Sequence, residues 1–146
     1  MTDNLSRFTA RDDAYNSRDW DAYSALLDDS FRGWMQGRAH AEGKAEHLRN
    51  AKEFCALSAD NRVHNSPYVV ALSDREWTCT IASFTGSMTG PLKTGEGKTV
   101  QPSHRTFETT FATIARWVGG KIVEEYEFLD ASAILGQVVG ADAGRG

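Results

Sequence analysis

Two adjacent glycines, Gly119 and Gly120, separate two runs of residues that alternate in the manner of β-strands. Adjacent glycines supply the positive φ values that a two-residue hairpin turn requires. The run before them, His104–Val118, places these residues on one face: Phe107, Thr109, Phe111, Thr113, Ala115 and Trp117. The glycine pair therefore predicts a long β-hairpin. It also sets the register, because a slip of one residue would turn every side chain to the opposite face.

The returning strand is unusually acidic for a strand that belongs to a core. Strict alternation would place Val123, Glu125, Glu127 and Leu129 on one face and Ile122, Glu124, Tyr126 and Phe128 on the other. If the first face lines an apolar pocket, two carboxylates stand about 7 Å apart there. Desolvation and mutual repulsion would then raise the pKa of Glu127 toward the working pH of an acid/base catalyst. The alternative is a solvated strand at the open end of the sheet.

The order of the remaining elements predicts the fold class. Apolar spacing of three and four residues indicates helices before the strands, and alternation indicates two more strands before the hairpin. The predicted elements are helices near 5–15, 20–27 and 43–57, strands at 63–72 and 75–86, and a final helix at 131–139 capped by Asp130. Pro67 restricts its strand to an edge or a bulge, and residues 87–103 form a hairpin loop, lid or dimer arm. This order predicts an α+β domain with helices on one face of a curved antiparallel sheet.

Length and charge narrow the classes of function. The 146 residues suit a single domain, with a flexible tail from about residue 140. A net charge of −4 argues against nucleic-acid binding. The chain shows neither a signal-peptide start nor an apolar run of about 18 residues, so we expect a cytoplasmic protein without a membrane span. His40 and His47 lack the spacing of a zinc motif, and we expect neither a metal nor a cofactor.

Three runs, in order along the chain, resemble the SnoaL-like polyketide cyclase family of the nuclear transport factor 2-like superfamily, which also includes ketosteroid isomerase-like proteins. The first run is Ala14–Ala22, AYNSRDWDA, and the second is Phe84–Leu92, FTGSMTGPL. The third is Phe111–Trp117, FATIARW, which leads into Gly120–Asp130, GKIVEEYEFLD, and Ile134–Gln137, ILGQ. The set spans nearly the whole chain, and its order is fairly specific for the fold.

The resemblance implies a cone-shaped sheet wrapped around the N-terminal helices, an apolar pocket and a homodimer. Cyclases of this family close a ring by an intramolecular aldol step without a metal or organic cofactor. Their acid/base residue is an aspartate on the return strand, directly after an aromatic residue. Here Glu127 follows Tyr126 at that place, and Thr113 stands where these cyclases tend to carry a histidine.

Other polar residues are candidates for the pocket. Asp12 lies on the apolar stripe of the first helix, where a carboxylate is costly unless paired. It would hydrogen-bond Tyr15, line the cavity, or be exposed after a slight rotation of the helix. Tyr15 also resembles a pocket tyrosine of the cyclases and is a candidate proton donor or orienting group. His64 suits acid/base work near neutral pH, with an ordinary surface histidine as the alternative.

The predicted ligand is a small apolar molecule, of aromatic or polyketide-like type. Large apolar side chains suit the walls of its pocket, although many serve the core or an interface. The candidate ligand-binding residues are Glu125, Trp34, Trp77, Phe84, Phe111, Thr113 and Asp130. The first predicted function is cofactor-independent proton transfer next to a carbonyl, as in a cyclase, isomerase or dehydratase. The second is non-catalytic binding of a hydrophobic small molecule. Apolar residues on both faces of 104–118 predict a homodimer through the sheet face away from the helices.

Overall fold

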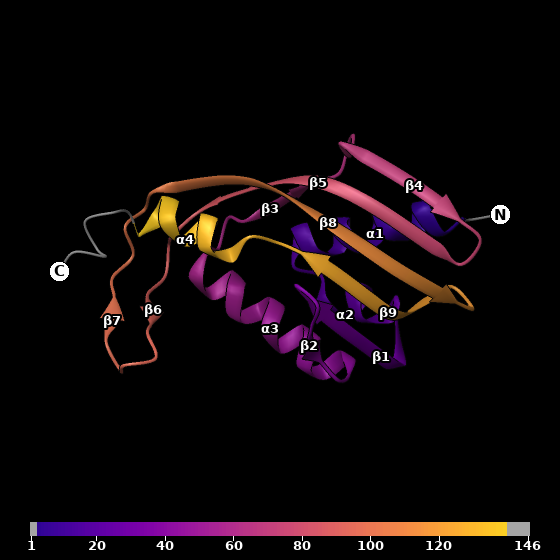
Figure 1. Cartoon of the computed structure of the whole chain (residues 1–146), viewed down its shortest axis with the longest axis horizontal. Helices are drawn as coiled ribbons and strands as arrows, with labels where there is room; N and C mark the ends of the chain where they lie inside the picture. Colours follow the sequence, from indigo (N-terminus) through magenta and orange to yellow (C-terminus); the bar gives the residue numbers. More distant parts are fainter. Residues whose placement is uncertain (1–2, 140–146) are drawn as a thin grey trace.

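The computed structural model describes residues 3–139 and shows four helices with an extended sheet (Figure 1). The predicted flexible tail lies outside these residues. The helices are α1 Asn4–Ser17, α2 Trp20–Ala25, α3 Lys44–Leu57 and α4 Ala131–Val138. The strands are β1 Leu27–Met35, β2 Arg38–Ala41, β3 Arg62–His64, β4 Val70–Asp74, β5 Trp77–Ser87, β6 Leu92–Lys93, β7 Thr99–Val100, β8 Thr106–Val118 and β9 Lys121–Phe128.

The main sheet has the order β2-β1-β9-β8-β5-β3, and β4 pairs with β5 as well. Neighbouring strands run antiparallel except β1 and β9, which are parallel. The sheet is open, and the α+β prediction with helices packed on a curved, mostly antiparallel sheet is confirmed. Strands β1 and β2 were not predicted, because Asp28, Asp29 and Gly33 mask the alternation that buries Leu27 and Phe31.

The β8–β9 hairpin forms at the predicted glycines. Gly119 and Gly120 have φ values of 59° and 80°, and Val118 pairs with Lys121. The register then shifts, since Trp117 pairs with Ile122 whereas Arg116 pairs with Glu124. Val123 is thus the extra residue of a β-bulge. The prediction that Val123 shares a face with Glu125 is therefore wrong, and Ile122 is buried together with Glu125.

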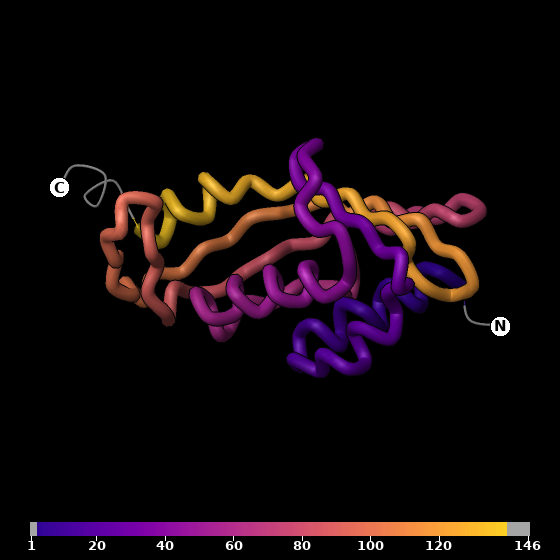
Figure 2. Tube along the Cα trace, turned by 90° about the horizontal axis from the view of Figure 1, so that it is seen from below, coloured from indigo at the N-terminus to yellow at the C-terminus, as the bar shows by residue number. Residues whose placement is uncertain are grey.

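Two other predicted segments differ in detail. The single strand expected at 63–72 is divided into β3 and β4, which both pair with the same edge of β5 on either side of Pro67. The long segment after β5 forms a small ribbon of β6 and β7, at the same end of the molecule as α4 (Figures 1 and 2). The β4–β5 and β8–β9 hairpins lie at the opposite end.

Two apolar clusters divide the interior. The first joins α1 and α2 to β1, β8 and β9, with Phe8, Tyr23, Phe31, Trp117 and Ile122 among its members. The second joins β5 and β8 to α4, with Phe84, Met88, Phe107, Ile134 and Val138 among its members. Within residues 3–139, no helix combines the length and the apolar character that a membrane crossing needs. Helix α3 covers the sheet beside both clusters. The residues that lie between the two clusters therefore determine what the interior can bind.

Candidate functional site

A cavity of about 420 Å³ lies between α3 and the inner face of the sheet. One face of α3 supplies a wall, because His47, Asn50, Ala51, Phe54 and Leu57 follow the spacing of successive helical turns. The other lining residues are Arg11, Tyr15, Tyr23, Met35, His40, Glu53, Val63, Phe84, Pro91, Leu92, Phe111, Glu127, Leu129 and Ala131. Arg11 and Tyr23 are buried, whereas Glu53, Pro91 and Ala131 are exposed. The cavity therefore has a closed polar end near Arg11 and opens between α3, β6 and the start of α4.

Arg11 is the centre of the closed end. Its Nη1 donates to Asp12 Oδ1 at 2.8 Å, and its Nη2 donates to Glu125 Oε1 and, at 3.5 Å, to Glu127 Oε1. The guanidinium also lies 4.9 Å from the ring centroid of Tyr23 and 5.0 Å from that of Phe8. We call Arg11, Asp12, His47, Glu125 and Glu127 the Arg11 cluster. Three carboxylates in this cluster thus surround one buried cation.

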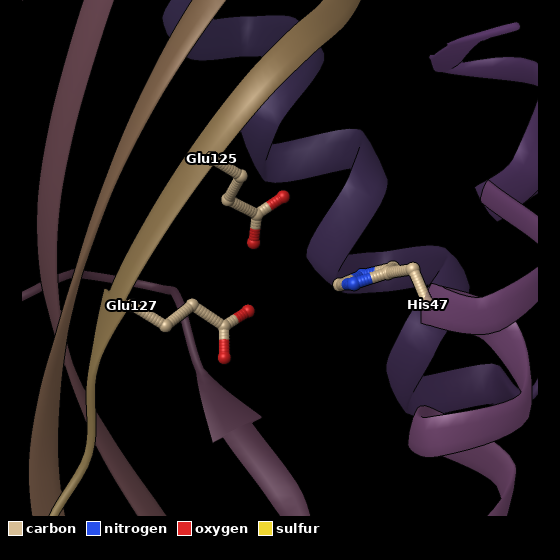
Figure 3. Close-up of side chains that lie close together, drawn as sticks. All are labelled: His47, Glu125 and Glu127. Atoms are coloured by element: carbon tan, nitrogen blue, oxygen red, sulfur yellow. The ribbon is translucent and has the colours of Figure 1, made fainter. Parts of the chain in front are cut away.

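Figure 3 shows the carboxyl groups of Glu125 and Glu127 pointing from β9 toward His47 on α3. The Glu125 side chain is 1 % exposed, whereas that of Glu127 is 17 % exposed and lines the cavity. Burial raises the pKa of Glu125 well above its usual range, although Arg11 opposes this. Burial also acts to raise the pKa of Glu127, but the hydrogen bond from Glu125 and the charge of Arg11 lower it overall. The predicted rise for Glu127 is therefore wrong, because Glu125 and Arg11 together lower its pKa, and the raised pKa belongs to Glu125.

His47 faces these carboxyl groups from the opposite wall. Its Nε2 shares a hydrogen bond of 2.7 Å with the Tyr23 hydroxyl, and the two rings stack. Burial lowers the pKa of His47 to about 4, so the imidazole is neutral near pH 7. Ligand atoms of His47, Glu125 and Glu127 all lie within 4.8 Å of one another, a spacing that could hold a metal ion. Arg11 and Tyr23 already bond to this set.

The first helix places its two candidates differently. Asp12 is buried and accepts a hydrogen bond of 2.7 Å from Tyr68, not from Tyr15. Its other carboxylate oxygen accepts from Arg11, so Asp12 positions the guanidinium. Burial raises the pKa of Asp12. Tyr15 does line the cavity, but its hydroxyl donates to Asn61 Oδ1 at 2.6 Å. The phenolic proton of Tyr15 is therefore engaged, which favours a wall or orienting group over a proton donor.

Four predicted site residues lie elsewhere. His64 is exposed on the edge strand β3, where Nε2 bonds to Thr85 Oγ1 at 2.7 Å. Trp34 stacks on Tyr126, and Trp77 also packs against Tyr126, on the outer face of the sheet. Asp130 is the N-cap of α4, as predicted, and accepts from the Ala133 amide at 3.0 Å. The assignment of these residues to the pocket is corrected, because strand alternation and the helix cap turn them away from it.

The remaining candidates lie on the inner face of the sheet. Phe84 and Phe111 line the cavity and contact each other edge to face, with centroids 5.4 Å apart. Thr113 is buried directly opposite Glu127 in the β8–β9 register. Within residues 3–139 its hydroxyl oxygen has no hydrogen-bond partner.

Sequence reasoning did not identify Arg11, Tyr23 or His47 as site residues. Arg11 carried a usable signal, because it lies three residues after Phe8 on the buried stripe of α1. A cation beside Asp12 on such a stripe indicates a buried ion pair. Tyr23 and His47 gave no local signal, since only the packing of α2 against α3 brings them together.

The comparisons with known proteins agree with this fold. Solved structures with the same fold include a candidate SnoaL-like polyketide cyclase from Jannaschia sp. CCS1, with 18% identity and a TM-score of 0.78 over 92% of this chain and 90% of that one. IdmH, a candidate polyketide cyclase from Streptomyces antibioticus, has 17% identity and a TM-score of 0.76 over 93% and 98% of the chains. A hypothetical protein with a ketosteroid isomerase-like fold from Catenulispora acidiphila has 16% identity and a TM-score of 0.73 over 94% of this chain and 95% of that one.

No curated protein sequence matches this chain significantly. The family model of the SnoaL-like polyketide cyclases, in contrast, matches residues 7–138. That match includes Arg11, the cavity-lining face of α3 and the whole β8–β9 hairpin. The chain belongs to the SnoaL-like polyketide cyclase family.

Proposed function

We propose that the protein is a cofactor-independent enzyme that transfers a proton next to a carbonyl group of an apolar small molecule. Cyclisation, isomerisation and dehydration all begin with such a step. Membership of the family supports a cyclase or isomerase type of role in general. One observation carries the specific proposal: Glu127 brings a carboxylate into an otherwise largely apolar cavity, and Arg11 and Glu125 favour its ionised form.

In this proposal Glu127 is the base. It takes the proton from the carbon beside the carbonyl, and the electron pair of the broken C–H bond moves onto the carbonyl oxygen as an enolate. The Tyr23–His47 pair on the opposite wall would orient that oxygen and stabilise its charge. The enolate then takes the proton back at another carbon or attacks a second carbonyl of the same molecule. Phe84, Phe111 and Leu129 would hold the apolar body of the substrate.

Two features of related structures support a small ligand in this fold. Several are named as candidate polyketide cyclases, and the Catenulispora protein was solved in complex with trimethylamine.

We also propose a homodimer through the outer face of the sheet, where Trp34, Trp77 and Tyr126 form an aromatic patch. Light scattering at micromolar concentration should give twice the mass of the chain, and Trp34→Lys should shift it to the monomer. A wild-type monomer would contradict this arrangement.

Hydrogen–deuterium exchange tests the proposed reaction even when its product has not been identified. A panel of polycyclic ketones and aromatic β-diketones is incubated with the protein in D₂O, and exchange beside the carbonyl is followed by NMR. We expect catalysed exchange for at least one ketone that also binds, and its loss in Glu127→Gln. Binding of ketones without any catalysed exchange would support the non-catalytic binding function instead.

A further inference from the structure

The Arg11 cluster holds more negative than positive charge. Three carboxylates from Asp12, Glu125 and Glu127 face a single guanidinium, and His47 is neutral near pH 7. Even with a proton on Glu125, one negative charge is not balanced. Of the cavity-lining residues in the described part of the chain, only Arg11 carries a permanent positive charge. Buried charge without a partner is costly, so the cluster favours a further cation or proton.

Buried polar atoms without a hydrogen-bond partner also lie beside Arg11: among residues 3–139 they are one donor, Arg11 Nε, and two oxygens, Glu125 Oε2 and Thr113 Oγ1. Among residues 3–139, Glu125 Oε2 finds no donor, although its side chain is 1 % exposed. The same holds for the hydroxyl oxygen of Thr113, which lies across the strand pair from Glu127. A ligand that brings several N–H donors would satisfy carboxylate oxygens of this cluster.

We propose that the closed end of the cavity is a binding site for an organic cation, the protonated primary amine of a ligand whose remaining part is an apolar ring. The ammonium would lie at Glu127, between the β9 carboxyl groups and the ring of Tyr23. Arg11 shows that this environment accepts a cation, because its guanidinium already lies over Tyr23. The ring would extend toward Phe84 and Phe111. This site rests on the cavity of the proposed function but not on its chemistry, and an amine bound at Glu127 should block proton transfer there.

A divalent metal ion is the competing cation, since His47, Glu125 and Glu127 have suitable spacing. Two contacts oppose it. Arg11 occupies one oxygen of each glutamate and would repel a doubly charged ion more strongly than a singly charged ammonium. A metal would also require His47 Nε2 to give up its bond to Tyr23. An ammonium donates hydrogen bonds to acceptors that are already in place, and the aromatic walls attract it through their π faces. The ionisable groups that face the site are Arg11, Asp12, Tyr15, Tyr23, His40, His47, Glu53, Glu125 and Glu127.

Three probes with one ring system and different charges test the proposal by calorimetry at pH 7.5. They are 2-naphthylmethylamine, 2-naphthalenemethanol and 2-naphthoate. We expect the amine to bind about tenfold more tightly than the alcohol, since charge-assisted hydrogen bonds are the stronger ones, and the carboxylate at least about 100-fold more weakly than the amine. In buffers of different ionisation enthalpy, binding of the amine should release protons from the Glu125–Glu127 pair, whereas binding of the alcohol should not.

Glu127→Gln is the matched variant. In this variant the amine should bind no more tightly than the alcohol, and its binding should release no protons. Continued binding of the alcohol would also show that the cavity is folded. The proposal is overturned if naphthoate binds as tightly as the amine or more tightly. It is also overturned if only the alcohol binds, although that result would not contradict the proposed enzyme. Failure of all three probes overturns both the cation site and the ligand cavity. Micromolar binding of Zn²⁺ or Mn²⁺ that excludes the amine would replace the organic cation with a metal.

Discussion

Glu124 and Glu125 are neighbours on β9, but they stand on opposite faces of the sheet. Glu124 is 25% exposed and lies 3.7 Å from Arg116, which is itself 37% exposed. Glu125 is 1% exposed and pairs with Arg11, which is 4% exposed. Both are glutamate–arginine pairs, but the inner pair is removed from water. On the outer face water screens the pair, whereas on the inner face each charge depends on its partner.

The largest expected effect follows from removing the two arginines in turn. Arg11→Met leaves the carboxylates of Asp12 and Glu127 without their cation, and we expect it to lower the free energy of unfolding by about 3–5 kcal/mol. Arg116→Met should cost no more than about 1 kcal/mol, because its pair is exposed. Urea unfolding at pH 7 measures both. Similar losses in the two variants would mean that burial does not separate the two faces.

The pH dependence of stability isolates His47. Its folded pKa of about 4 lies below the ordinary value of 6.5, so the unfolded chain binds the additional proton between these values. His47 therefore contributes stability above pH 6.5 that is lost as the pH falls to about 4, by roughly 3 kcal/mol. Glu125 acts in the opposite sense, since its raised pKa makes its contribution fall as the pH rises above 4.5.

The measurement is a series of unfolding curves from pH 7 to pH 4. Relative to wild type, His47→Gln should lose less stability on acidification. His64→Gln, on the exposed edge strand, is the matched control and should follow the wild-type curve. Parallel curves for all three proteins would contradict a neutral, buried His47.

Two buried threonines on the inner face allow a hydrogen-bonded hydroxyl to be compared with one that has no partner among residues 3–139. Thr78 Oγ1 accepts a hydrogen bond of 3.0 Å from Trp117 Nε1, so Thr78→Val should cost about 1–3 kcal/mol. Thr113 Oγ1 has no partner among residues 3–139, so Thr113→Val should be neutral or slightly stabilising in the free protein. Thermal unfolding compares the two substitutions directly. An equal loss for Thr113→Val would indicate that its hydroxyl is bonded after all.

A small effect is also expected at Asp130, outside the cavity. Because its side chain caps α4, Asp130→Ala should lower the free energy of unfolding by about 1 kcal/mol. Binding of a cavity ligand should not change, since the carboxylate is engaged by the Ala133 amide. If Asp130→Ala lost affinity for the ligand while its free energy of unfolding stayed unchanged, Asp130 would belong to the ligand site.

The sequence predicted those parts of the molecule in which local signals decide the structure. The Gly119-Gly120 turn, the alternation of β8 and the cap of α4 all depend on nearby residues, and all formed as expected. The bulge at Val123 was not predictable in this way, because it arises from the pairing with β8. Strand β1 was missed for a similar reason, since its polar residues are explained only by its position beside β9.

The candidate site shows the same division. Glu127 was found because alternation and the family resemblance agree on its position. Arg11, Tyr23 and His47 come from three helices and meet only in the folded chain. The direction of the Glu127 pKa was therefore predicted wrongly. A carboxyl group in an apolar cavity is expected to hold its proton, unless a buried guanidinium lies beside it.

The inner glutamate Glu127 is proposed to do chemistry that the outer glutamate Glu124 does not. This difference is tested most directly by the rate of carbonyl-adjacent exchange in D₂O for a ketone that binds, compared among wild type, Glu127→Gln and Glu124→Gln. We expect that Glu127→Gln binds the ketone but exchanges its protons slower by a factor of about 10² or more, while Glu124→Gln matches wild type. Full exchange in Glu127→Gln would contradict the proposed role of Glu127.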